Sequence, residues 1–135
     1  DEDLIEFLIQ KSRPYTYTTA IPPSFCNAIL TSLKLIDNGE QKEKLLTNIS
    51  YFKSIASQLG LQFGISNSAI QPLVIGSSSA ALKLSNQLFE EGFFVSAIRP
   101  PTVPPNTARL RFTLSANHTS QQINKLLEKV KNVMA

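Results

Sequence analysis

The sequence predicts an α/β (α+β-like) fold, in which helices cover one face of a mainly antiparallel sheet and two or three further helices precede it. Apart from residues 12–23, the spacing of apolar residues is helical up to Gly60, and strand-like segments then alternate with helical ones to the end of the chain. Apolar residues make up 42% of the 135 residues. Charged residues make up only 17%, which is below the usual share of about 25% and favours a packed domain.

The beginning of the chain predicts two helices joined by a loop. Residues 4–10 form a short apolar helix, and the acids before it favour a helix N-terminus. Residues 12–23 are rich in hydroxyl groups and prolines, which predicts a loop. A second helix over residues 23–37 begins at Pro23 and ends before Gly39, because proline suits a first helical turn and glycine often follows a last one.

Residues 40–59 have the strongest helical pattern in the chain, and Gly60 provides its stop. The period then changes, which predicts short strands over residues 61–65 and 69–75. Another helix follows over residues 79–91. The apolar residues that define the first of these helices are Leu45, Leu46, Ile49, Phe52, Ile55, Ala56 and Leu59.

Two more strands are predicted over residues 93–98 and 108–115, with a proline-rich loop between them. The second alternates cleanly, because leucines and Phe112 fall on one face while two arginines and Thr113 fall on the other. Thr119 is then suited to cap a final amphipathic helix. The apolar stripe of that helix consists of Ile123, Leu126, Leu127 and Val130.

We therefore expect residues 1–39 to form a helix–loop–helix segment and residues 40–135 a small α/β domain. The formal net charge is only +3 and the lysines are scattered, which argues against a nucleic-acid partner. No apolar stretch approaches the ~20 residues of a membrane span, and the acidic start is unlike a signal peptide.

The single cysteine, Cys26, cannot form an internal disulfide and fits a reducing, cytoplasmic setting. No histidine lies near it in the sequence, so we expect a small buried side chain without catalytic work. His118 is expected to form local hydrogen bonds before the last helix. No cluster of His, Cys, Asp and Glu has the spacing of metal ligands, so we expect no metal site.

The most distinctive stretch is residues 97–105, in which Arg99 follows an apolar run and precedes two Pro-Pro pairs. Proline fixes its own φ and restricts the residue before it, so Arg99 is expected on a stiff, extended backbone. A guanidinium held in this way suits bidentate binding of a carboxylate or phosphate. The alternative is a surface arginine beside a rigid loop. We interpret Arg109 and Arg111 as the polar face of a strand.

Four stretches of the chain resemble the α-oxoamine synthases, which are pyridoxal-phosphate enzymes of fold type I. They occur in the order and at the spacing of that family and together span essentially the whole chain. The most specific is Ala-Ile-Arg-Pro-Pro-Thr-Val, at residues 97–103. The resemblance implies that residues 40–135 form the small C-terminal domain of this fold and that residues 1–39 are the segment that leaves its large pyridoxal-phosphate domain. The four stretches are residues 17–23, 68–73, 95–103 and 108–118.

The resemblance also implies a reaction, a decarboxylative condensation of an amino acid with an acyl thioester that uses pyridoxal 5'-phosphate. The segment 97–103 is similar to that of the family members of biotin synthesis, whose substrates are L-alanine and pimeloyl-CoA or a pimeloyl carrier protein. The resemblance to the family further implies a cytoplasmic homodimer. The alternatives are glycine C-acetyltransferase, 5-aminolevulinate synthase, or a non-catalytic module that binds anions or a partner protein.

For individual positions, the resemblance implies that Arg99 holds the amino-acid carboxylate and that Thr102 contacts the substrate. Thr18 and Thr19 would reach the cofactor phosphate of the neighbouring subunit, although Ala20 departs from the serine often found there. The family is considerably longer, and its Schiff-base lysine lies in a His-x-x-Thr-x-x-Lys motif that this sequence lacks. We therefore expect a C-terminal fragment that contains no catalytic residue and is inactive by itself.

Overall fold

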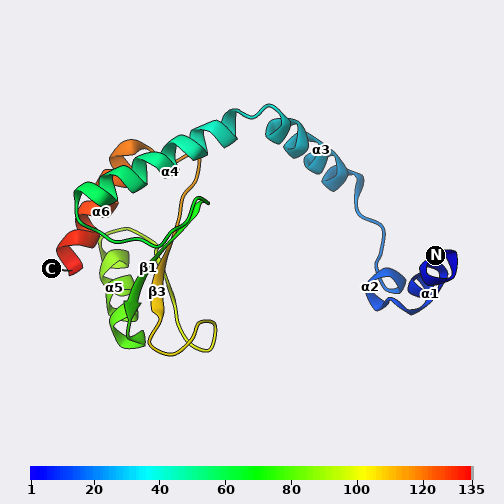
Figure 1. Ribbon diagram of the computed structural model, residues 1–135. Coiled ribbons are helices and arrows are strands. Elements are labelled where there is room, and N and C mark those ends of the chain that lie inside the picture. The colour runs from blue at the N-terminus through cyan, green and yellow to red at the C-terminus, as the bar shows by residue number, and fades with distance from the viewer. Residues whose placement is uncertain (135) are drawn as a thin grey trace. The chain divides into compact units, whose positions relative to one another are not determined.

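The computed structural model describes residues 1–134 and divides into two compact units. The first unit comprises Asp1–Asn38, and the second begins at Gly39. Within the described residues, the first unit contains three helices, and the second contains three helices and three strands. Figure 1 labels these elements except β2.

The helices of the first unit are α1 (Glu2–Lys11), α2 (Arg13–Thr16) and α3 (Pro23–Asp37). The Asp1 side chain accepts a hydrogen bond from the Asp3 N–H (3.2 Å) and caps α1. The short helix α2 contradicts the uninterrupted loop predicted over residues 12–23. Pro14 explains the difference, because its fixed φ and missing N–H suit the first turn of a helix.

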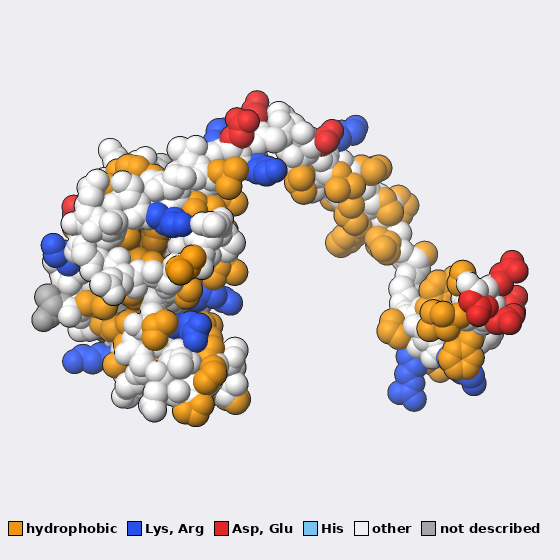
Figure 2. Space-filling model, in the orientation of Figure 1, with side chains coloured by type: hydrophobic (Ala, Val, Ile, Leu, Met, Phe, Trp, Pro, Cys, Tyr) orange, Lys and Arg blue, Asp and Glu red, His pale blue; other side chains and the backbone are white. Residues whose placement is uncertain are grey.

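No side chain in the helices of the first unit is buried. The apolar residues of α1 and α3 are exposed, and Figure 2 shows them gathered over both helices. Cys26 is exposed as well, so the expectation of a buried thiol was wrong. The apolar spacing of α3 predicts a buried face, but nothing within the described residues of this unit covers that face.

The second unit is an antiparallel sheet of three strands with three helices. Its elements are α4 (Glu40–Gln58), β1 (Ile70–Gly76), α5 (Ser78–Glu90), β2 (Ser96–Ile98), β3 (Ala108–Thr113) and α6 (Ser120–Met134). The strand order is β1-β3-β2, so the last strand in the sequence lies in the middle. Leu110 of β3 is paired with Leu73 on one side and with Ala97 on the other. The predicted antiparallel sheet is confirmed.

The helices of this unit lie on one side of the sheet, as the sequence predicts (Figure 1). Along β3, Ala108, Leu110 and Phe112 are buried among the helices, whereas Arg111 and Thr113 are exposed. Alternate side chains of a strand point to opposite faces, so the open face of the sheet is the one that presents the arginines of β3.

An aromatic cluster joins α4 to the central strand. The ring centroid of Phe63 lies 4.8 Å from that of Phe52 and 5.2 Å from that of Phe112, and both pairs are edge-to-face. Edge-to-face packing places the positive ring edge against the negative ring face and adds to the burial of apolar area. Phe52 and Phe112 are almost completely buried, which confirms the core positions predicted for them.

The strand expected over residues 61–65 was a wrong prediction. Within the described residues, one backbone hydrogen bond joins this segment to β1, from the Gly64 N–H to the Pro72 C=O (3.0 Å). Pro72 has no N–H to return the bond, so a ladder cannot form there. The strand predicted over residues 93–98 is also shorter, because regular pairing with β3 begins only at Ser96.

Thr119 caps α6, as the sequence predicts. The Gln122 N–H donates to Thr119 Oγ1 (3.2 Å), and the Thr119 N–H donates to Gln122 Oε1 (2.9 Å). This reciprocal pair is a capping box, which satisfies two backbone donors that the helix itself leaves free. The predicted apolar stripe is buried at Ile123, Leu127 and Val130.

Replacing Phe52 tests the aromatic cluster. We expect Phe52→Ala to lower the free energy of unfolding of the second unit by about 3–5 kcal/mol, because it leaves a cavity in the core. Phe94→Ala is the matched control, since Phe94 is 84% exposed and surface changes usually cost about 0.5 kcal/mol or less. Urea unfolding followed by circular dichroism measures both losses, and equal losses would contradict this packing.

Candidate anion-binding site

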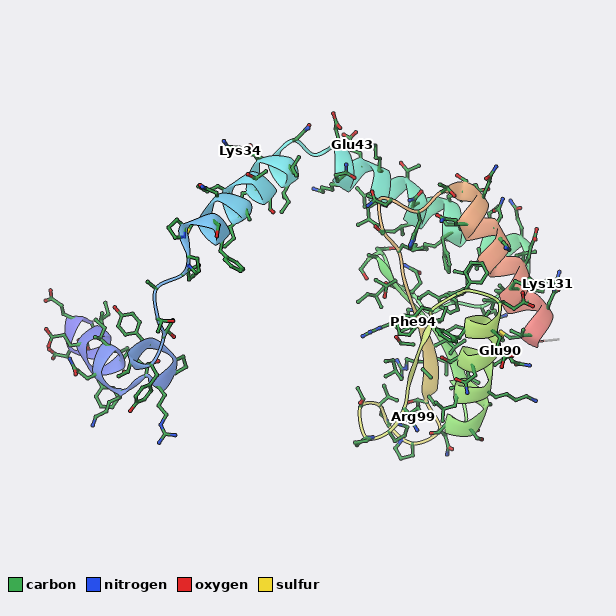
Figure 3. All side chains as sticks on the ribbon, turned by 180° about the vertical axis from the view of Figure 1, so that it is seen from behind. Lys34, Glu43, Glu90, Phe94, Arg99 and Lys131 are labelled. Carbon is green, nitrogen blue, oxygen red and sulfur yellow. The ribbon has the colours of Figure 1, made fainter. Side chains whose placement is uncertain are left out.

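Arg99 follows β2 directly and begins the proline-rich loop that leads to β3 (Figure 3). The preceding residue, Ile98, is paired with Arg109 of β3, so the sheet fixes the backbone at this point. The Arg99 side chain is exposed. The one ion pair in the described part of the chain joins Lys129 to Glu91 (2.7 Å), so no carboxylate there neutralises the Arg99 guanidinium.

A tight turn over residues 99–102 places Arg99 and Thr102 at its two ends. The Thr102 N–H donates to the Arg99 C=O (3.0 Å), and the peptide bond between Pro100 and Pro101 is cis. A turn of this kind holds its first and last Cα atoms within about 7 Å. Thr102 is exposed like Arg99. The structure therefore brings these two predicted substrate-binding residues together at one corner of the sheet.

A second turn closes the loop over residues 104–107. Asn106 has a φ of 61°, and the Thr107 N–H donates to the Pro104 C=O (3.2 Å). Proline at the second position and asparagine with positive φ at the third are the residues that a type II turn favours. The Thr107 hydroxyl also donates to the Pro104 C=O (2.8 Å), which fixes the threonine side chain.

The two arginines of β3, both predicted on the polar face of the strand, differ in their contacts. Arg109 Nε donates to the Thr107 C=O (3.1 Å), and its Nη2 donates to Thr107 Oγ1 (3.2 Å). Arg109 therefore has a structural role, because it holds Thr107 at the end of the loop.

Arg111 makes no such bond within the described residues, and it is exposed on the open face between its pairing partners Pro72 and Ser96. It is therefore a second candidate anion-binding side chain, beyond the polar strand face predicted for it. Alternation along the strand cannot distinguish it from Arg109, because the difference arises in the turn that positions Thr107.

Thr18 and Thr19 lie in the first unit, on the segment between α2 and α3, and both are exposed. The Thr18 hydroxyl donates to the Pro14 C=O. No hydrogen bond of the Thr19 side chain occurs within the described residues. The Thr19 hydroxyl can thus donate a hydrogen bond to a phosphate oxygen without first losing another, whereas the Thr18 hydroxyl would have to release the Pro14 carbonyl.

The remaining polar groups fit structural roles. His118 Nδ1 accepts a hydrogen bond from the Ser115 N–H (3.2 Å), in agreement with the local role expected for it. Among residues 1–134, no three His, Cys, Asp or Glu side chains gather as metal ligands would. The helices of the same range include none with the length and apolar character needed to cross a bilayer.

The fold and the matched sequence define the class of protein. The chain belongs to the aminotransferase class I and II family, whose family model matches residues 1–130.

Curated relatives with high identity to the chain are named 8-amino-7-oxononanoate synthase. The chain is 51% identical over 128 residues to that of Hydrogenovibrio crunogenus and equally to that of Methylococcus capsulatus. The match takes in 94% of this chain but 32% and 33% of those proteins, so the chain spans about a third of their length. The resemblance to the α-oxoamine synthases is confirmed.

Solved structures confirm the fold class. The crystal structure of 8-amino-7-oxononanoate synthase from Francisella tularensis is 34% identical, with a TM-score of 0.78, over 98% of this chain and 39% of that one. The serine palmitoyltransferase of Sphingomonas wittichii is 29% identical, with a TM-score of 0.83, over 96% of this chain and 33% of that one. The small sheet and its helices are therefore those of a fold type I domain.

Substitution of Asn106 tests the second turn. Asn106→Ala is expected to cost about 1–2 kcal/mol of stability, because a Cβ-bearing residue without a polar side chain is disfavoured in the left-handed region. Asn106→Gly should remain close to the parent, since glycine adopts positive φ readily. Thermal and urea unfolding measure the difference. If the alanine variant proved as stable as the glycine variant, the assigned backbone conformation would be incorrect.

Proposed function

We propose that the whole protein condenses L-alanine with a pimeloyl thioester, with loss of CO2, as an acyltransferase of biotin synthesis. The observation that best supports this is 51% identity, over nearly the whole chain, to curated 8-amino-7-oxononanoate synthases. The exposed and unneutralised Arg99 supports it independently, because both the amino acid and the pimeloyl group carry carboxylates. The acyl carrier would be coenzyme A or a carrier protein.

In this proposal, Arg99 binds the carboxylate of the amino acid. Its planar guanidinium can donate two parallel hydrogen bonds, which orients the carboxylate as well as attracting it. Thr102, at the other end of the same turn, offers a hydroxyl that can donate to or accept from the substrate. The prolines and turns of this loop restrict its backbone, so little conformational entropy is lost when the substrate binds.

Pyridoxal 5'-phosphate is the cofactor implied by the family, and when bound it supplies an electron sink for breaking a bond at the amino-acid Cα. The two adjacent hydroxyls at Thr18 and Thr19 are exposed and fit a phosphate group. We propose that they contact the phosphate held by the neighbouring subunit of a homodimer, with Thr19 the readier donor. The setting proposed for this reaction is the cytoplasm.

Steady-state assays of the whole enzyme test the reaction itself. L-Alanine with pimeloyl-CoA or a pimeloyl carrier protein should give product and CO2, whereas glycine with acetyl-CoA or succinyl-CoA should give little. Preference for a glycine pair would instead identify glycine C-acetyltransferase or 5-aminolevulinate synthase. Absence of any condensation, combined with tight binding of small carboxylates, would favour a non-catalytic anion-binding module.

Arg99→Ala in the whole enzyme is expected to raise the KM for L-alanine about tenfold or more, because hydrogen bonds to charged groups contribute about 1.5–3 kcal/mol. Arg99→Lys should recover little of this loss, since an ammonium cannot reproduce the planar fork. Arg111→Ala is the matched comparison, because Arg111 is also exposed and unneutralised in the described part of the chain. If Arg111→Ala raised the KM for L-alanine and Arg99→Ala did not, carboxylate binding would be assigned to Arg111 instead.

The 135-residue chain by itself is expected not to catalyse the condensation. Its sequence contains no His-x-x-Thr-x-x-Lys motif, and its nine lysines lie in other contexts. The measurement is an assay of the isolated chain with cofactor and both substrates, with the longer relative from Methylococcus capsulatus as the positive control. Turnover that disappears on replacing a lysine of this chain would overturn the expectation.

A further inference from the structure

The junction between the two units is the one place in the chain where an asparagine precedes a glycine, at Asn38-Gly39. Helix α3 ends at Asp37 and α4 begins at Glu40, so only these two residues separate the helices. The junction lies between the labelled Lys34 and Glu43 in Figure 3. Nothing in the proposed reaction uses it.

The space beside Gly39 is open, while Asn38 itself has helical dihedral angles (φ −55°, ψ −29°), so closure of an imide ring there requires rotation about the Asn38 ψ bond. The Asn38 N–H donates to the Lys34 C=O (3.2 Å), which ends α3. Gly39 then adopts a φ of 78°, and no heavy atom beyond its two chain neighbours lies within 4 Å of the position that a Cβ would occupy. Within the described residues, neither the Gly39 N–H nor the exposed Asn38 side-chain amide takes part in a hydrogen bond. The nucleophile and the carbonyl therefore belong to adjacent residues, and no hydrogen bond within the described residues holds either group.

We propose that Asn38 is a site of spontaneous deamidation. The Gly39 backbone nitrogen forms a bond to the Asn38 side-chain carbonyl carbon while its proton leaves with the amide as ammonia, which gives a cyclic imide. Water then opens the imide at either carbonyl, so that position 38 becomes aspartate or isoaspartate. The reaction needs only water, and asparagine is among the thermally labile residues of proteins.

The asparagines of the second unit lack this combination. Asn48 Nδ2 donates to the Ser115 and His118 carbonyls (both 2.9 Å) and is thereby held. Asn67 Oδ1 accepts a hydrogen bond from Lys53 Nζ (2.9 Å). Each of these asparagines is also followed by a residue with a Cβ, which crowds the attacking nitrogen.

The change would alter the link between the units chemically. It replaces a neutral amide by a carboxylate, between the acids at positions 37 and 40. The isoaspartate product also adds one methylene to the main chain between α3 and α4. A negative charge at this point is unfavourable for the C-terminus of α3 and favourable for the N-terminus of α4.

The test is incubation of the intact chain in warm, mildly alkaline buffer, followed by tryptic peptide mapping. Cleavage after Lys34 and Lys42 releases the peptide of residues 35–42, in which Asn38 is the only asparagine. We expect progressive loss of the parent peptide and the appearance of two products of equal mass, one of which is a substrate for an isoaspartyl methyltransferase. The peptide that contains Asn67 is the internal control and should remain unchanged over the same period.

Two variants make the test decisive. Asn38→Gln should abolish both products, because attack on the longer side chain closes a less favourable ring. Gly39→Ser should slow the loss of the parent peptide, because its Cβ crowds the nitrogen. Conversion of Asn67 at the same rate as Asn38, or survival of the parent peptide under these conditions, would overturn the proposal.

Discussion

The contact of the Phe63 ring with Phe52 and Phe112 is the interaction on which the candidate site depends, because it fixes helix α4 against the central strand β3. Strand β3 pairs with both neighbours, so its position determines the register of β1 and β2 together. Arg111 lies on β3 itself, and Arg99 follows the strand paired to it. The core on one face of the sheet thus fixes the position of Arg111 on the open face and of Arg99 at the end of β2.

The loop from Arg99 to Thr107 reaches a defined shape without burying apolar side chains. Its two turns are each closed by one backbone hydrogen bond, at 3.0 and 3.2 Å, and prolines restrict φ at four of the intervening positions. Such a loop loses little further backbone freedom when a ligand binds. Arg99 and Thr102 are therefore held in place while still exposed to water, whereas a flexible loop would lose conformational entropy when an anion binds.

Features that depend on local periodicity were predictable from the sequence. Phe52 and Phe112 occupy the expected core faces, and Thr119 forms the expected cap. Several of the failures arise where a residue outside the segment decides the outcome. Residues 61–65 have a strand-like composition, but the edge they face contains Pro72, which cannot return a hydrogen bond. Arg109 and Arg111 look alike on one strand, yet Thr107 engages only the first. Cys26 lies in a helix with an apolar face, but burial requires a partner surface that local sequence does not contain.

The two units differ in what stabilises them, and the geometry of the candidate site depends on the second unit. Most of the stability of a protein helix comes from packing of its apolar face, and the helices of the first unit have such faces without burying any residue within the unit. The second unit encloses its own core, from Ile49 to Val130. The turn that joins Arg99 to Thr102 rests entirely on the second unit. Its shape therefore follows from contacts that this part of the chain makes with itself, whatever covers the helices of the first unit.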